Sequence, residues 1–185
     1  MQTYETYRDQ LASLLAPLPP REQYFFGCWC TEKLSGLFSI EKIKKLSAAE
    51  SAQINGSMAF IWDSYTRFPD VGEQELYDTF EAVQQIEEKD FDQDDYAEYT
   101  AKALLIAQML ILSFIEERDP ELILDAAETL IQVMEFSISY NFGHDTTDLF
   151  NHPLISNELR LQQQMTERLA SGPAPGAGDK KLFRP

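Results

Sequence analysis

Apolar residues recur every three or four positions along most of the chain, which is the spacing of amphipathic α-helices. Alternation of the kind found in strands is nearly absent. Prolines after residue 15, at Pro69 and at Pro120 separate the apolar stripes from one another. The predicted helices cover about residues 3–15, 21–34, 48–67, 73–86, 92–118, 120 through at least 134, and 152–170.

Two of these helices are expected to form the centre of the protein. Residues 24–30 are apolar on nearly all sides of a helix, which predicts a buried position for the second helix. The longest predicted helix, 92–118, has an apolar middle and is expected to be the spine of the core. Gly56, inside the third helix, is interpreted as a close packing contact.

Local signals mark the beginnings of three helices. Ser47 and Glu50 have the spacing of a capping box, and Asp119 stands before a proline at a first helical position. Asp92, Asp94 and Asp95 would complement the positive end of the dipole of the longest helix.

The length and composition fit a single packed domain. The chain has 185 residues, of which 44% are hydrophobic and 12% aromatic. Residues 171–185 are rich in glycine and proline and are predicted to be a flexible tail. The sequence therefore predicts an all-α, single-domain bundle of about seven helices over residues 1–170, with a long central apolar helix.

The net charge of −16 is concentrated in one stretch of the chain. Between Asp70 and Glu98 there are twelve acidic residues and one base, Lys89. This charge argues against partners rich in phosphate, such as nucleic acid and anionic membranes, and favours a basic protein partner. Because Asp92–Asp95 are assigned to a helix start, the predicted partner-binding acidic face is the outside of the fourth helix. Its residues are Glu73, Glu75, Asp78, Glu81, Glu87 and Glu88.

Several features bear on where the protein is found. The beginning of the chain lacks a basic segment followed by an apolar one, so no signal peptide is expected. The longest apolar run, 103–115, is short for a membrane span. Cys28 and Cys30 point to different sides of a helix and are interpreted as buried free thiols. A cytoplasmic location is expected.

One cluster has residue types suited to metal binding or acid–base chemistry. Both histidines of the chain lie in it, and its members are His144, Asp145, Asp148 and His152. The alternative interpretation is turn chemistry, in which polar side chains satisfy the amides of a loop. Residues 90–101 have the alternating acids of a calcium loop but lack its glycine and its final glutamate, so capping is favoured there. No nucleophile motif and no cofactor motif is found, and no catalytic residue or cofactor is predicted.

The second helix resembles a stretch of the bacterial YjaG-like family of small helical proteins. The resemblance lies in Phe25, Cys28, Cys30 and Glu32-Lys33 and departs from the family at Thr31, where the family has an acid. It extends to residues 61–63, 128–134 and 152–155, with Glu158 and Gln162. It implies an all-helical bacterial cytoplasmic fold that can dimerise, and it implies no activity.

Three functions are compatible with the sequence. The first is a non-enzymatic protein-binding module, such as an immunity or antitoxin-like protein, that uses the acidic face to bind a basic partner. The second is a metal-dependent hydrolase or metal-binding protein built on the 144–152 cluster. The third is a homo-oligomeric helper, for instance a homodimer formed through an apolar helix.

Overall fold

The computed structural model describes residues 4–37, 43–142, 149–173, 175–176 and 178–179. Within these residues the regular structure is entirely helical, which confirms the predicted all-α bundle of seven helices. The α-helices are α1 (Tyr4–Leu15), α2 (Pro20–Ser35), α3 (Ala48–Arg67), α4 (Glu73–Glu87), α5 (Tyr96–Glu117), α6 (Pro120–Phe142) and α7 (Pro153–Ser171). A short 3-10 helix, η2 (Leu149–Asn151), precedes α7.

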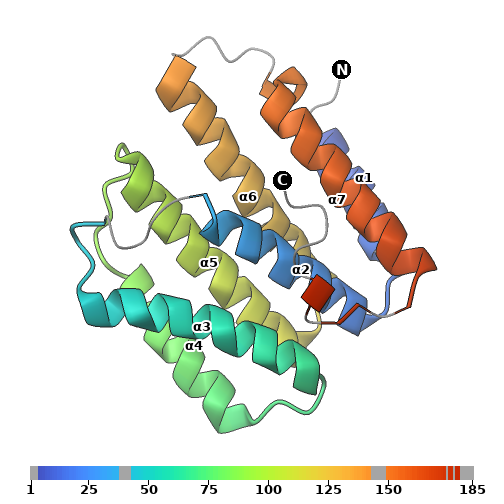
Figure 1. Ribbon diagram of the computed structural model, residues 1–185, viewed down its shortest axis with the longest axis horizontal. Coiled ribbons are helices and arrows are strands. Elements are labelled where there is room, and N and C mark those ends of the chain that lie inside the picture. The colour runs from blue at the N-terminus through green and yellow to red at the C-terminus, as the bar shows by residue number, and fades with distance from the viewer. Residues whose placement is uncertain (1–3, 38–42, 143–148, 174, 177, 180–185) are drawn as a thin grey trace.

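The helices are arranged around a central group of three (Figure 1). α5 and α6 lie side by side, and α2 packs against both. α1 and α7 pack on each other and on α6, whereas α3 and α4 pack on each other and on α5. The first and last helices, α1 and α7, therefore lie together on one side of the core, and the acidic α4 lies on the opposite side.

α2 is buried along most of its length, as predicted. Tyr24, Trp29 and Cys30 are fully buried, and Gly27 lies where α2 approaches its two central neighbours. A Cβ atom at Gly27 would lie 2.4 Å from Cδ1 of Ile111 and 2.7 Å from Cδ1 of Ile123. A larger residue at Gly27 would therefore force the ends of both isoleucine side chains to shift. The interpretation of Gly56 as a packing contact is wrong, because nothing lies within 4 Å of a Cβ atom built there.

The helix starts follow the capping chemistry of the sequence, with one correction. Ser47 and Glu50 form the predicted capping box. α5 begins at Tyr96, four residues later than predicted, because the carboxylate of Asp95 caps it by accepting from the amides of residues 97 and 98. The carboxylate of Asp92 accepts from the amide of Asp94 at 2.9 Å and holds a turn instead. Short acidic side chains satisfy turn amides as readily as they begin helices.

α5 is long and apolar enough to cross a membrane by length and composition alone. Of its most apolar window, 61% is buried inside the bundle. The core helix of a globular domain meets the same criterion, so the expectation that the chain has no membrane span stays a prediction.

Part of the C-terminal segment touches the bundle. Pro175 is buried, and the hydroxyl of Tyr65 on α3 donates to its carbonyl. The guanidinium carbon of Arg21 lies over the ring of the same tyrosine, 5.2 Å from the ring centroid. The flexibility of residues 171–185 stays a prediction.

Candidate functional site

The predicted acidic face lies on α4, which has one buried side and one exposed side. Leu76, Val83 and Ile86 point into the core and fix the orientation of the helix. The opposite side is turned to solvent. Of the six acids predicted there, all are exposed except Glu87, which is half-buried.

Three of these six acids are held by neighbouring side chains. Glu75 pairs with Arg67 of α3 at 2.8 Å, and Glu87 lies 3.4 Å from the ammonium group of Lys102 on α5. Gln74 donates to Asp78 at 2.7 Å. Glu75 and Glu87 therefore help to anchor α4 to α3 and α5, whereas the contact of Asp78 lies within α4.

The other three acids, Glu73, Glu81 and Glu88, form no ion pair within the described part of the chain. Tyr77 lies four residues after the first and four before the second, so these side chains share one side of the helix. Tyr77 is 61% exposed, which makes it one of the most exposed large apolar residues described. We call Glu73, Tyr77, Glu81 and Glu88 the α4 face. Charge alone did not reveal Tyr77, although its position outside the apolar stripe of α4 could have done so.

The predicted His/Asp cluster is largely beyond what can be described. His144, Asp145 and Asp148 lie outside the described residues. His152 is the N-cap of α7, and its Nδ1 atom accepts from the amide of Leu154 at 3.3 Å. Among the described residues no group of three acidic, histidine or cysteine side chains could hold a metal ion. The 144–152 site therefore stays a prediction, and elemental analysis of the purified protein would test it.

The two cysteines are buried free thiols, as predicted. Burial raises the pKa of both Cys28 and Cys30, because the thiolate form would lose its hydration. A nucleophilic cysteine needs a lowered pKa and access to a substrate. Neither thiol has these properties, so both serve the packing of α2.

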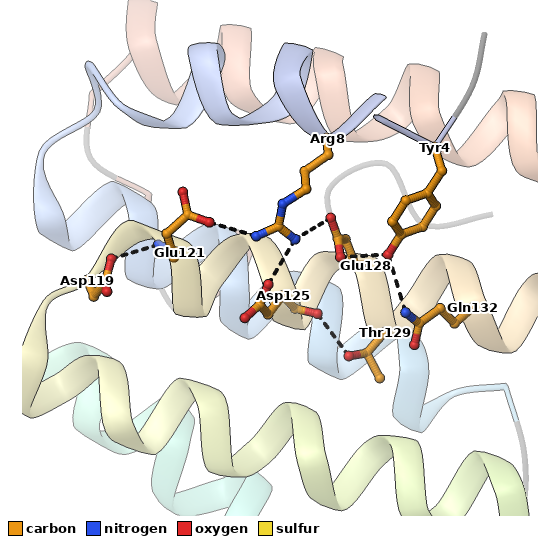
Figure 2. A network of polar contacts seen from close by, with 8 residues as sticks. All are labelled: Tyr4, Arg8, Asp119, Glu121, Asp125, Glu128, Thr129 and Gln132. Carbon is orange, nitrogen blue, oxygen red and sulfur yellow. Dashed lines mark hydrogen bonds and ion pairs between the residues drawn. The ribbon is translucent and has the colours of Figure 1, made fainter. Parts of the chain in front are cut away.

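A second acidic cluster joins α1 to α6 (Figure 2). Arg8 of α1 reaches Glu121 at 2.6 Å, Asp125 at 2.9 Å and Glu128 at 2.5 Å. The hydroxyl of Tyr4 donates to the second oxygen of Glu128 at 2.6 Å. We call Arg8 with its three carboxylates the Arg8 cluster. All three carboxylates converge on one guanidinium group, so the Arg8 cluster holds α1 against α6.

The pKa shifts within the Arg8 cluster agree with this role. Its three carboxylates raise the pKa of Arg8 above the ordinary value, against the opposing effect of desolvation. Burial and the hydrogen bond to Glu128 raise the pKa of Tyr4. Both side chains therefore keep their protons and continue to donate to the carboxylates of α6.

A third polar network runs through the interior between α2, α7 and α1. Lys33 pairs with Glu158, and its ammonium group lies 4.3 Å from the ring centroid of Trp29. Gln162 donates to Glu158 at 3.2 Å and accepts from the hydroxyl of Tyr7 at 2.6 Å. Desolvation raises the pKa of Glu158, and Lys33 opposes that shift. The charge pattern of the sequence did not indicate this network, because its residues lie on three helices that are distant in the sequence.

Comparisons with known proteins do not assign the chain to a family. No family model, no curated protein and no solved structure matches it. The resemblance to the YjaG-like family, which lies in the second helix and in residues 61–63, 128–134 and 152–162, therefore stays a prediction.

Proposed function

We propose that this protein is a non-enzymatic protein-binding module whose α4 face binds a basic protein partner. The observation that carries the proposal is the exposed Tyr77 between Glu73 and Glu81, two carboxylates that form no ion pair in the part of the chain that the structure describes. An exposed aromatic residue on a rigid helix supplies contact area at little cost in side-chain entropy, and tyrosine is enriched at the energetic centres of interfaces.

The acids around Tyr77 supply the selectivity of this surface. Glu73, Glu81 and Glu88 have no cation within the described residues to compensate them, so a partner that brings lysine or arginine gains charge pairs. The net charge of −16 accelerates encounter with basic proteins and repels phosphate. An immunity or antitoxin-like protein is one concrete form of this function, because a protein that handles nucleic acid presents a basic surface.

The test is capture of a partner at low salt, with variants that separate the anchor from the charge. Wild-type protein should retain a basic partner that high salt releases. Tyr77→Ala should weaken that complex about tenfold or more. The triple variant Glu73→Gln, Glu81→Gln, Glu88→Gln should slow its association and weaken it by at least as much.

A matched control changes the same number of charges on other surfaces. Glu5, Glu116 and Glu117 are exposed acids on α1 and at the end of α5, and their replacement by glutamine should leave the complex nearly intact. The proposal fails if no partner is released by salt. It also fails if both triple variants weaken binding equally, because the α4 face would then have no special part.

A homodimer is the second candidate, and a specific feature favours it. Four aromatic rings stack on the outside of the bundle, where Phe136 of α6 contacts Tyr96 and Tyr99 of α5 and Tyr140 of its own helix. The ring centroids of Tyr99 and Phe136 lie 4.4 Å apart. Tyr140 is exposed, so this aromatic ladder could continue into a second copy of the chain. Sedimentation velocity would show a dimer that Tyr140→Ser weakens, and a monomer at all concentrations would exclude this candidate.

A further inference from the structure

A polar pocket of about 450 Å³ lies between α1 and α7, which run side by side (Figure 1). The described residues that line it fall within 7–14 of α1 and 156–163 of α7, so both walls are continuous helices. A volume of this size lies in the range of pockets that hold small molecules. The chemistry of the lining therefore indicates which class of ligand the pocket suits.

Arg160 is the one charged residue among the described residues that line this pocket. Its guanidinium group donates to the side chain of Asn157 at 2.7 Å and forms no ion pair within the described part of the chain. Glu167, two turns further along α7, accepts from Gln163 at 2.9 Å and is not among the described lining residues. Because a guanidinium group has five N–H donors, Arg160 retains donors for an anionic group in the pocket.

Two buried residues, Tyr7 and Gln162, form the inner part of the lining. The hydroxyl of Tyr7 donates to the side-chain oxygen of Gln162 at 2.6 Å, and the amide of Gln162 donates to Glu158 at 3.2 Å. Lys33 compensates the charge of Glu158, so this acid opposes an anion in the pocket only weakly. The two hydrogen bonds fix both side chains, so the inner lining is ordered before a ligand binds.

Hydroxyl oxygens on both walls are left to accept hydrogen bonds. Ser13 donates to the carbonyl of residue 10 at 2.7 Å, and Ser156 donates to the carbonyl of residue 153 at 3.3 Å. Each hydroxyl has a single proton, so its oxygen retains lone pairs that can accept from a ligand, and the same holds for Tyr7. The lining also has an apolar part, which consists of Leu11, Leu14 and Leu159.

We propose that this pocket binds a small hydroxycarboxylate, such as a sugar acid, with its carboxylate on Arg160 and its hydroxyl groups on the serine and tyrosine oxygens. A guanidinium fork matches the two oxygens of a carboxylate. The carbon framework of the ligand would lie against the leucines. A phosphate group fits less well, because it carries nearly two charges and the described lining has one base.

This site does not depend on the α4 face. The pocket lies between α1 and α7, whereas α4 packs on α3 and α5. Neutralising the acids of the α4 face should therefore leave binding in this pocket unchanged.

The experiment is an NMR titration of the isotope-labelled full chain with three probes that share one sugar ring: glucuronate, glucose and glucosamine. The net charge of −16 attracts cations, and about 0.15 M salt screens this attraction without reversing it, so net charge alone predicts that glucosamine binds most tightly. Glucuronate should instead bind about tenfold more tightly than glucose and shift amide signals of α1 and α7. No saturable shift with glucuronate, or tighter binding of glucosamine, would overturn the proposal.

Two variants test the position of the carboxylate. Arg160 is exposed, so Arg160→Gln should fold, reduce the affinity for glucuronate about tenfold and leave that for glucose unchanged. Arg168→Gln makes the same charge change in the last turn of α7, outside the described lining, and should leave both affinities unchanged. Equal losses in the two variants would contradict the placement of the carboxylate on Arg160.

A blocking variant and a competitor test the location and the anionic group. Ser156 is exposed, so Ser156→Trp should fold, fill the pocket and abolish binding of glucuronate, with folding checked by circular dichroism. A folded Ser156→Trp protein that binds glucuronate as wild type does would show that the sugar acid binds elsewhere. Inorganic phosphate at the same concentration should not displace glucuronate, and displacement would overturn the assignment of a carboxylate.

Discussion

Two acidic clusters of this protein differ in how their charges are compensated. On α6, three carboxylates converge on Arg8, and Glu128 among them is nearly buried. On the α4 face, three carboxylates surround an exposed tyrosine and pair with no base in the described residues. The first arrangement ties α1 to the core, whereas the second leaves its interactions to be made with another molecule.

The comparison also explains why the single base of the acidic stretch does not neutralise α4. Lys89 pairs with Glu50 at the start of α3, at 2.6 Å, and also donates to the carbonyl of Lys45. Lys45 in turn pairs with Glu98 at 2.8 Å. These bases join the segments before α3 and α5. An acid count along the sequence therefore says little about which carboxylates are free, because pairing is decided by neighbours in space.

The largest expected effect comes from removing the base of the Arg8 cluster. In Arg8→Ala, Glu128 loses its cation in a nearly buried position, with a side chain only 9% exposed. Arg8 itself is 32% exposed and water partly screens its other two pairs, so we expect the free energy of unfolding to fall by about 2 kcal/mol. Urea denaturation measures this change.

Arg8→Lys is the matched control for that measurement. A lysine retains the positive charge but cannot reach three carboxylates with a planar fork, so about half of the loss is expected. A loss below about 0.5 kcal/mol in Arg8→Ala would show that the Arg8 cluster behaves as an ordinary surface ion pair. The contrast with the α4 face would then disappear.

Much of the fold followed from local patterns in the sequence. Apolar spacing predicted all seven helices, and the capping box at Ser47 was read directly from residue types. The start of α5 was misplaced because aspartates at 92 and 95 serve a turn and a cap equally well, and only one of them can be the N-cap. Helix existence is set by many residues, whereas a boundary is set by one or two.

The candidate sites were less predictable, for a physical reason. The acidic side of α4 was recognised from charge, but Glu75 and Glu87 are held by Arg67 and Lys102, which lie on other helices. The interior network of Lys33, Glu158 and Gln162 joins helices that are distant in the sequence, and no local motif records that assembly.

A smaller effect is expected when the acids of the α4 face are neutralised. In the triple variant Glu73→Gln, Glu81→Gln, Glu88→Gln, no described ion pair is lost and mutual repulsion falls. The free energy of unfolding should therefore change by no more than about 0.5 kcal/mol, in the stabilising direction. Thermal and urea unfolding measure it. A clear destabilisation would mean that these carboxylates hold the fold as those of the Arg8 cluster do.

The smallest effect concerns pH and distinguishes paired from unpaired acids directly. Lys89, with the capping contacts of Ser47, lowers the pKa of Glu50 from its ordinary value of 4.5 to about 2. Because the pKa is lower in the folded state, Glu50 contributes stability above pH 4.5 that is lost as the pH falls toward 2. Glu50→Gln keeps the capping geometry and removes this titration.

The unfolding free energy of Glu50→Gln should therefore lie below that of wild type at neutral pH and converge with it between pH 4.5 and 2. Taking the difference between the two proteins at each pH cancels Glu158, whose pKa is raised by desolvation and whose titration acts in the opposite direction. Glu88→Gln, which removes an acid that forms no ion pair within the described residues, should give a flat difference over the same range. If both variants give the same pH profile, the pairing of Glu50 with Lys89 adds nothing beyond the general charge of this surface. The distinction between acids that pair with a base and acids that do not would then have no effect on the pH dependence of stability.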